Sequence, residues 1–143
     1  MRYAIGIDLG GTSIKYALVD KAGNSFFEGK LPSFASVSAA KVMEQLIKAA
    51  TLLKDEAAKL NWTVLGIGLG TPGIVDETNR IVLGGAENII GWENIDVASL
   101  MEKQMSLPVV VGNDANLMGL GETKYGAGRG CTHVVFLTVG TGI

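Results

Sequence analysis

The feature that most restricts the fold is a pair of alternating segments joined by Asp-Leu-Gly-Gly-Thr at residues 8–12. Apolar side chains occupy every second position of residues 3–9 and again of residues 13–19, which is the spacing of half-buried strands. The short glycine-containing connection predicts an antiparallel hairpin. Residues 25–31, between a turn at 20–24 and Pro32, are predicted to add a third strand.

The rest of the chain alternates between helical and strand patterns. Apolar residues recur at three- and four-residue steps from about Ser38 to Leu60, which predicts an amphipathic helix. The further elements expected in order are a buried strand at 64–70, short strands at 73–76 and 80–84, a helix at 97–105, a strand at 109–112, a helix at 113–125 and a strand at 133–139. This order predicts an α/β fold with a mixed sheet, its first three strands antiparallel and helices on its faces.

Composition excludes several classes of partner. The formal net charge is −2, which gives no electrostatic footprint for nucleic acid or an anionic membrane surface. The amino terminus has no charged leader, and no run approaches the roughly 18 apolar residues of a membrane span, so we expect a cytoplasmic protein. The single cysteine, Cys131, leaves no disulfide framework or cysteine-based metal cluster and is expected to be a small buried residue.

The pentapeptide at residues 8–12 also carries chemistry. Gly10 and Gly11 allow backbone N–H groups to converge on an anion, and Thr12 and Ser13 add hydroxyl donors. Asp8 beside a phosphate is best explained by Mg²⁺ between the two negative groups. The alternative is a plain hairpin with Gly-Gly at a two-residue turn and a solvated Asp8.

A second glycine turn lies at the carboxyl end. Gly140, Thr141 and Gly142 follow the predicted strand at 133–139 and would form a second phosphate loop opposite the first. Neither loop is a Walker A sequence, because no Gly-Lys-Ser or Gly-Lys-Thr follows.

A buried strand delivers Asn113 and Asp114 to its carboxyl end. In the functional interpretation Asp114 is the base that deprotonates an attacking hydroxyl, and Asn113 binds a neighbouring hydroxyl. In the structural interpretation Asp114 is a helix N-cap, which would satisfy helix N–H groups whatever the function. Trp62 and Trp92 are expected to pack in the core or at its edge.

Together, residues 5–20, 68–76, 87–92, 113–116 and 138–143 resemble the ROK family (repressor, open reading frame, kinase) in order and spacing. The resemblance covers the whole chain and implies an actin-like ATPase (ribonuclease H-like) domain. It also implies transfer of the ATP γ-phosphoryl group to a hydroxyl of a hexose or N-acetylhexosamine, most simply the 6-hydroxyl as in a glucokinase.

The resemblance implies a role for each matched position. Asp114 matches the catalytic base and Asn113 its sugar-binding neighbour, while Asp8 matches the Mg²⁺ site. The other sugar-side matches are Gly73, Ile74, Ala86 and Asn88. The matches to the two ATP phosphate loops are Gly10, Gly11, Thr12, Ser13, Gly140, Thr141 and Gly142.

Several expectations concern the whole protein. Residues 1–125 would form the first domain and 126–143 the start of a second, so this segment alone should not catalyse. Structural zinc could be held only beyond Ile143, and a homodimer is expected of the full-length protein. Residues 88–92 read Asn-Ile-Ile-Gly-Trp where many family glucokinases have Asn-Leu-Pro-Gly-Trp, which loosens any choice of sugar.

Two other functions remain open. A ROK repressor would bind sugar as an effector, but such regulators carry a winged helix before the kinase-like region, whereas this chain begins on its first strand at Tyr3. A non-catalytic ATPase-like module is the third possibility.

Overall fold

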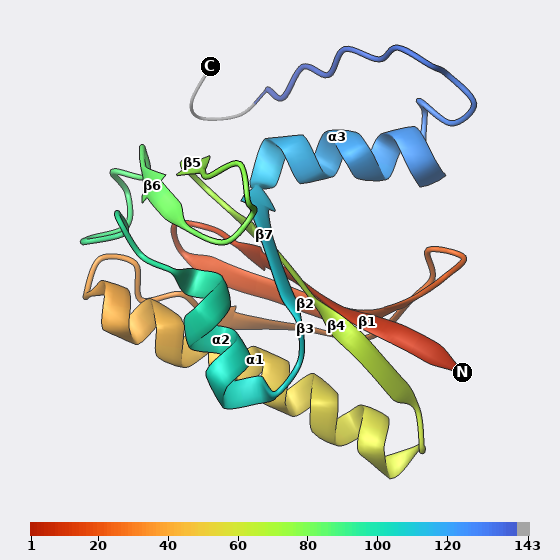
Figure 1. The fold of residues 1–143 in the computed structure, drawn as a ribbon, viewed down its shortest axis with the longest axis horizontal. Coiled ribbons are helices and arrows are strands. Elements are labelled where there is room, and N and C mark those ends of the chain that lie inside the picture. The colour runs from red at the N-terminus through yellow and green to blue at the C-terminus, as the bar shows by residue number, and fades with distance from the viewer. Residues whose placement is uncertain (140–143) are drawn as a thin grey trace.

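A five-stranded mixed sheet forms the centre of the computed structural model, which describes residues 1–139 (Figure 1). The strand order across the sheet is β3-β2-β1-β4-β7. The strands are β1 (Arg2–Leu9), β2 (Ser13–Asp20), β3 (Ser25–Pro32), β4 (Thr63–Thr71) and β7 (Val109–Asn113). The first three are antiparallel, and β4 and β7 run parallel to β1, so the predicted hairpins, third strand and parallel crossover are confirmed.

The parallel register brings three strand ends to one edge of the sheet. Asp8 on β1 is level with Gly70 on β4, which in turn is level with Gly112 on β7. Thr71 pairs with Asn113 one residue further along. Side chains that follow these strands are therefore neighbours despite their distance in sequence.

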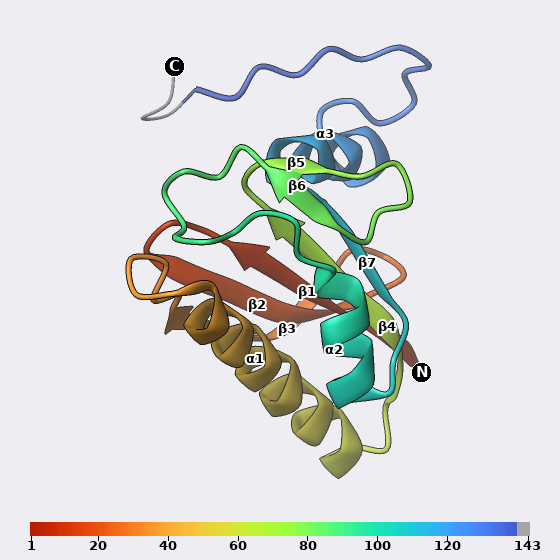
Figure 2. The same cartoon turned by 60° about the vertical axis from the view of Figure 1, so that its left-hand side comes forward.

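Two helices cover one face of the sheet, α1 (Ala39–Lys59) and α2 (Val97–Met105) (Figure 2). The Ser38 hydroxyl caps α1 by accepting a hydrogen bond from the Lys41 N–H at 3.1 Å. The apolar stripe of α1 packs on the side chains that alternate inward from β1 and β2, which form the core. The fully buried members of this core include Ile5, Leu9, Ile14, Leu18, Val42, Leu46 and Leu53.

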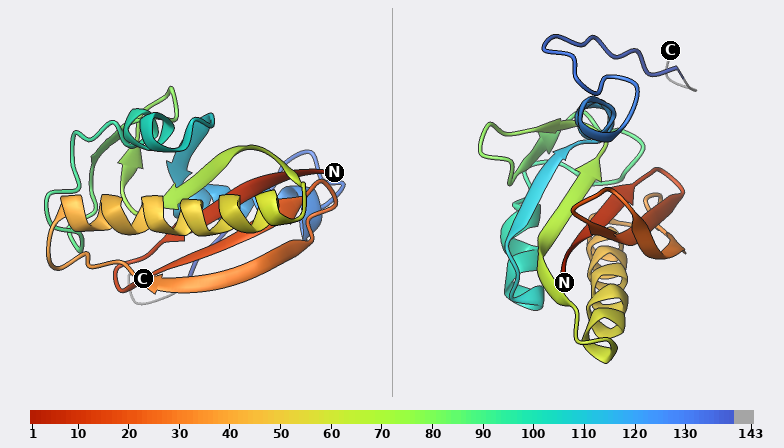
Figure 3. Two further views of the ribbon diagram at one scale, coloured as in Figure 1. Left: turned by 90° about the horizontal axis from the view of Figure 1, so that it is seen from below. Right: turned by 90° about the vertical axis from the view of Figure 1, so that its right-hand side faces the viewer.

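Among residues 1–139, the other face is covered only near β4 and β7, by α3 (Asp114–Tyr125) (Figure 3). A Cβ on Gly112 would lie 3.0 Å from the Leu117 side chain, so the absence of a side chain there lets α3 pack closely on the sheet. Small residues, Gly6 and Gly68 among them, floor the uncovered part of this face.

A small hairpin of β5 (Ile74–Val75) and β6 (Val82–Gly84) leads into residues 85–92. Asp76 closes the hairpin by accepting hydrogen bonds from the Arg80 and Ile81 N–H groups, both at 2.8 Å. These bonds and the Thr78 hydroxyl lower the pKa of Asp76 to about 2, the Ile81 N–H having the largest effect. The Arg80 guanidinium is bidentate to Glu102 on α2, so the hairpin is fixed to the helical layer.

The carboxyl-terminal residues differ from the sequence-based expectation. Residues 133–139 form a mostly apolar run that predicts a strand, but the structure forms no strand there, and Val135 and Leu137 are 97% and 81% exposed. A strand needs a partner for its backbone groups, and within residues 1–139 no sheet edge pairs with this segment. Cys131, expected to be buried, is exposed as well.

Within residues 1–139, no helix has the length and apolar character needed to cross a lipid bilayer.

Candidate active site

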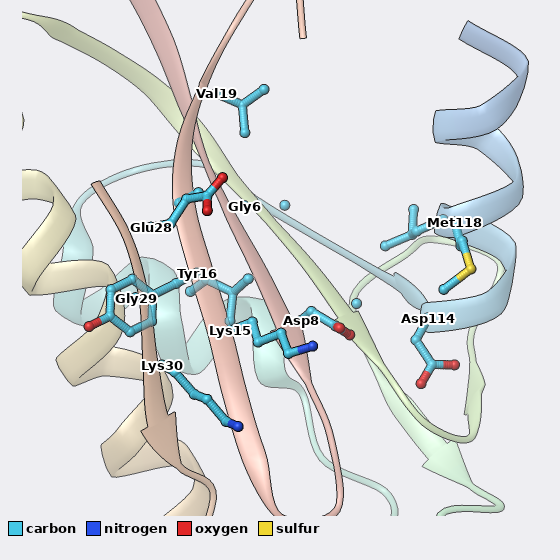
Figure 4. A pocket seen from close by; sticks show the side chains of 15 residues that line it. Gly6, Asp8, Lys15, Tyr16, Val19, Glu28, Gly29, Lys30, Asp114 and Met118 are labelled. Atoms are coloured by element: carbon cyan, nitrogen blue, oxygen red, sulfur yellow. The ribbon is translucent and has the colours of Figure 1, made fainter. Parts of the chain in front are cut away.

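Two carboxylates from distant parts of the chain face one cavity. Asp8 near the end of β1 and Asp114 in the first turn of α3 both line a cavity of about 790 Å³ (Figure 4). Lys15, the cross-strand partner of Asp8 on β2, and Gly70 lie on the same wall. The cavity therefore combines acidic and basic groups at the edge where the parallel strands end.

The surroundings of Asp8 favour a cation. Burial raises the pKa of Asp8 above its usual 3.8, the Asp114 carboxylate raises it further, and Lys15 opposes both. A bound cation would relieve the repulsion between the two carboxylates. Residues 1–139 contain no group of three or more His, Cys, Asp and Glu side chains arranged as a metal cage. A site with one or two carboxylates fits Mg²⁺, which usually takes its remaining ligands from water and phosphate.

The turn after β1 comprises residues 10–12, because Leu9 pairs with Ile14 and β2 starts at Ser13. Neither Gly10 nor Gly11 has a positive φ, so the Gly-Gly two-residue turn of the alternative interpretation is wrong, although its exposed Asp8 is found in the structure. Gly10 donates its N–H to the Ser13 carbonyl at 2.9 Å and is occupied within the turn. The N–H groups of Gly11 and Thr12 make no hydrogen bond to any group of residues 1–139 and are available to an anion.

The glycine at position 11 is needed for a close approach. A Cβ on Gly11 would lie 2.7 Å from the Asn88 amide nitrogen, which is closer than real Cβ atoms come to other heavy atoms. The phosphate-loop candidate and the predicted sugar-side residue Asn88 are therefore in direct contact.

Asn113, not Asp114, caps α3. The Asn113 Oδ1 accepts from the Asn116 N–H at 3.2 Å, and its Nδ2 donates to the Gly73 carbonyl at 2.7 Å. Asp114 is the first residue of the helix, with one carboxylate oxygen accepting from the Ala115 N–H at 2.8 Å. The interpretation of Asp114 as the N-cap is therefore wrong, and its second oxygen accepts no hydrogen bond within residues 1–139.

Of the remaining sugar-side candidates, Gly73 contacts Asn113 directly. Gly73 has φ +93°, and a Cβ there would lie 2.5 Å from the Gly84 carbonyl oxygen and 3.1 Å from Ala86. Ala86 is buried and Asn88 is exposed beside the turn at 10–12. Ile74 pairs with Gly84 through its backbone, and its side chain is 63% exposed. Gly140, Thr141 and Gly142 lie outside the described residues.

One buried hydrogen bond was not anticipated from the sequence. Trp92, 2% exposed and in the core as expected, donates its indole N–H to the Thr71 hydroxyl at 2.9 Å. Thr71 is fully buried at the end of β4, next to Pro72 and Gly73. A threonine ending an otherwise apolar strand was the only sequence signal, and it did not identify the partner.

One protein-family model matches almost the whole chain. Residues 4–143 match the model of the ROK family. This chain belongs to the ROK family. A glucokinase of Halalkalibacterium halodurans is 32% identical over 99% of this chain and 42% of its own length. A xylose repressor of Caldicellulosiruptor bescii is 31% identical over 97% of this chain and 34% of its own.

A solved ROK structure has the same fold. The ROK family glucokinase of Streptomyces griseus, in complex with glucose and AMPPNP, superposes with a TM-score of 0.78 and 33% identity. The match covers 90% of this chain and 38% of that protein. The α/β fold is thus the actin-like ATPase fold of the ROK sugar kinases, and the chain spans about two fifths of the relatives' length.

Proposed function

We propose that the protein carrying this ROK chain is an ATP-dependent sugar kinase. It would transfer the ATP γ-phosphoryl group to a hydroxyl of a hexose or N-acetylhexosamine. As in a glucokinase, the acceptor would be the 6-hydroxyl. The proposal rests mainly on the position of Asp114. This residue is not the N-cap of α3, and it faces Asp8 across one cavity. Two glucokinase relatives at more than 30% identity support the same reaction.

Asp114 is the proposed base. The attacking sugar oxygen forms a bond to the γ-phosphorus as the bond to the ADP oxygen breaks, and the hydroxyl proton passes to the Asp114 carboxylate. The Ala115 N–H orients one oxygen of that carboxylate and leaves the other for the sugar hydroxyl.

Asn113 is the proposed partner of a neighbouring sugar hydroxyl. Its amide is fixed at both ends, by the Asn116 N–H and the Gly73 carbonyl. One Nδ2 hydrogen and one Oδ1 lone pair remain free for the substrate. Gly73, Ile74, Ala86 and Asn88 would form the rest of the sugar side.

The turn at residues 10–12 is the proposed phosphate site. The free N–H groups of Gly11 and Thr12 and the hydroxyls of Thr12 and Ser13 would donate to ATP phosphate oxygens. Asp8 would hold Mg²⁺, which neutralises phosphate charge when bound. Gly140–Gly142 is proposed as the second phosphate loop, and a second domain is proposed to begin at residue 126.

A coupled kinase assay of the full-length protein tests the proposal. MgATP would be offered with glucose, fructose, mannose, allose and the N-acetylated amino sugars in turn. ADP release that depends on one of these sugars and is lost in Asp114→Asn is the expected result. Sugar-independent ATP hydrolysis would instead indicate an ATPase, and no ATP turnover at all would contradict a kinase and favour a non-catalytic ATPase-like module.

A sugar-responsive repressor is the second candidate, since a xylose repressor is 31% identical to this chain. A repressor needs to bind sugar but needs no base, so Asp114→Asn would leave its response unchanged. A gel shift with the full-length protein and its own upstream DNA separates the two functions.

A further inference from the structure

We infer that Trp92 is a positioning residue for the sugar site, acting through Thr71 on the loop that orients Asn113 and on the loop that carries Asn88. The inference rests on the proposed function and adds a determinant of sugar affinity. It concerns residues that lie behind the loops and not in the cavity.

The hydrogen bond between Trp92 and Thr71 is well shielded. The exposed fractions of the two residues are 2% and 0%, and the indole nitrogen lies 2.9 Å from the Thr71 hydroxyl oxygen. That hydroxyl in turn donates to the Pro72 carbonyl at 3.0 Å. With one bond accepted and one donated, the hydroxyl has a fixed direction, and removing either partner would leave a buried polar group unsatisfied.

The first loop affected is residues 72–74. The Pro72 carbonyl is fixed by Thr71, and the next carbonyl, that of Gly73, accepts from the Asn113 amide at 2.7 Å. A change in the peptide plane at Pro72 would therefore rotate the acceptor that orients Asn113. The bond from Trp92 thus reaches the proposed sugar-binding amide through one residue of backbone.

The second loop affected is residues 85–92, which Trp92 ends. Turn bonds run from the Ile89 N–H to the Ala86 carbonyl at 3.0 Å and from the Trp92 N–H to the Ile89 carbonyl at 3.3 Å. The Ile90 N–H donates to the Ala35 carbonyl at 3.0 Å. The Trp92 side chain holds this loop against the end of β4, and the loop places Asn88 against Gly11.

A purely space-filling role makes a different prediction. If Trp92 only filled the core, phenylalanine would cost stability through lost volume but would leave the loops in place. If the indole N–H positions the loops, phenylalanine and a Thr71 variant without the hydroxyl would weaken sugar binding in the same way. Measurement of the sugar KM of both variants therefore separates the two roles.

The experiment compares Trp92→Phe and Thr71→Val in the full-length protein, with Trp62→Phe as the matched control. Trp62 stacks on Tyr3 at 4.1 Å, at the end of β1 opposite to Asp8. We expect Trp92→Phe and Thr71→Val each to raise the sugar KM about 10-fold, as loss of a buried hydrogen bond would. We expect kcat and the MgATP KM to stay within about twofold. The double variant should bind sugar no more weakly than Thr71→Val alone, because Thr71→Val already removes the hydrogen bond that Trp92→Phe removes.

Calorimetric sugar binding distinguishes failure of this inference from failure of the kinase assignment. A wild-type protein that binds and phosphorylates sugar, with Thr71→Val and Trp92→Phe retaining its sugar KM, would overturn the positioning role alone. Should Trp92→Phe fail to fold, Thr71→Val decides the question by itself. A wild-type protein that neither binds nor phosphorylates sugar would overturn the proposed function and this inference with it.

Discussion

Asp8 and Asp114 face the same cavity from two strand ends that are joined in the sheet only through β4 (Figure 4). The Asp114 carboxylate contributes to the raised pKa of Asp8, so the two groups influence each other electrostatically. Two neighbouring carboxylates are unfavourable in an empty cleft and become favourable when a proton or a metal ion is present. The pair can therefore divide the chemistry, with one group for the cation and one for the proton.

The first prediction concerns Asp114. We expect Asp114→Asn in the full-length protein to lower kcat for sugar phosphorylation by about 10²–10⁴-fold, the usual contribution of a general base. Circular dichroism and the melting temperature should change little, because Asn113 keeps the α3 cap. Asp55→Asn, at an exposed position on α1, serves as the control. Wild-type turnover in Asp114→Asn would refute the assigned role.

The second prediction concerns Asp8 and Mg²⁺. We expect Asp8→Asn to raise the KM for MgATP by about 10-fold or more, because the amide replaces an anionic ligand by a neutral one. The sugar KM should move much less. Titration of activity with Mg²⁺ at fixed ATP measures the effect, and an unchanged Mg²⁺ dependence would remove Asp8 from the metal site.

The third prediction uses the pKa of Asp8 without any ligand. A carboxyl whose folded-state pKa is raised favours the folded state when protonated, and this contribution is lost as the pH rises from 3.8 through the folded pKa. The asparagine of Asp8→Asn cannot ionise, so this variant does not lose that stabilising contribution as the pH rises. We therefore expect the variant to gain thermal stability relative to the wild type as the pH rises above 3.8. A constant difference in melting temperature across that rise would contradict a raised pKa.

The sequence predicted the elements well because their signals are local. The apolar periodicity of α1, the alternation in β1 and β2 and the turn residues around α2 each depend on neighbours within one element. Residues 133–139 show the limit of such signals. The apolar run there satisfied the strand pattern, but a strand also requires a partner, and none pairs with it in residues 1–139.

The residues of the candidate site could be named from the sequence, but their contacts could not. Asp8, Asn113 and Asp114 could be named because each lies at or just after the end of a strand, and these strand ends share one edge of the sheet. The contact of Gly11 with Asn88 and the hydrogen bond of Trp92 to Thr71 join loops that are remote in sequence. No spacing rule encodes such contacts, because they depend on how loops pack after the sheet has formed.

The fourth prediction concerns the contact between Gly11 and Asn88. We expect Gly11→Ala to lower kcat/KM about 10-fold. The added Cβ would lie only 2.7 Å from the Asn88 amide nitrogen and would push that amide out of its position. The fold should tolerate the change, since Gly11 has no positive φ. Asn88→Ala provides the second side of a double-mutant cycle. If the contact is the cause, Gly11→Ala should cost much less in the Asn88→Ala background, and additive losses would show that alanine acts in another way.

The fifth prediction separates backbone strain from steric overlap at the sugar side. Gly73 and Gly91 both have positive φ, +93° and +71°. A Cβ at Gly91 would meet only the Ala39 side chain at 3.7 Å, whereas one at Gly73 would lie 2.5 Å from the Gly84 carbonyl oxygen. We expect Gly91→Ala to lower the free energy of unfolding by about 1 kcal/mol from strain alone. Gly73→Ala should cost about 3 kcal/mol, because rigid backbone must move as well. Chemical denaturation of the full-length variants measures both free energies. Equal losses of stability would mean that the backbone of the β5–β6 hairpin moves to accommodate a methyl group at no added cost.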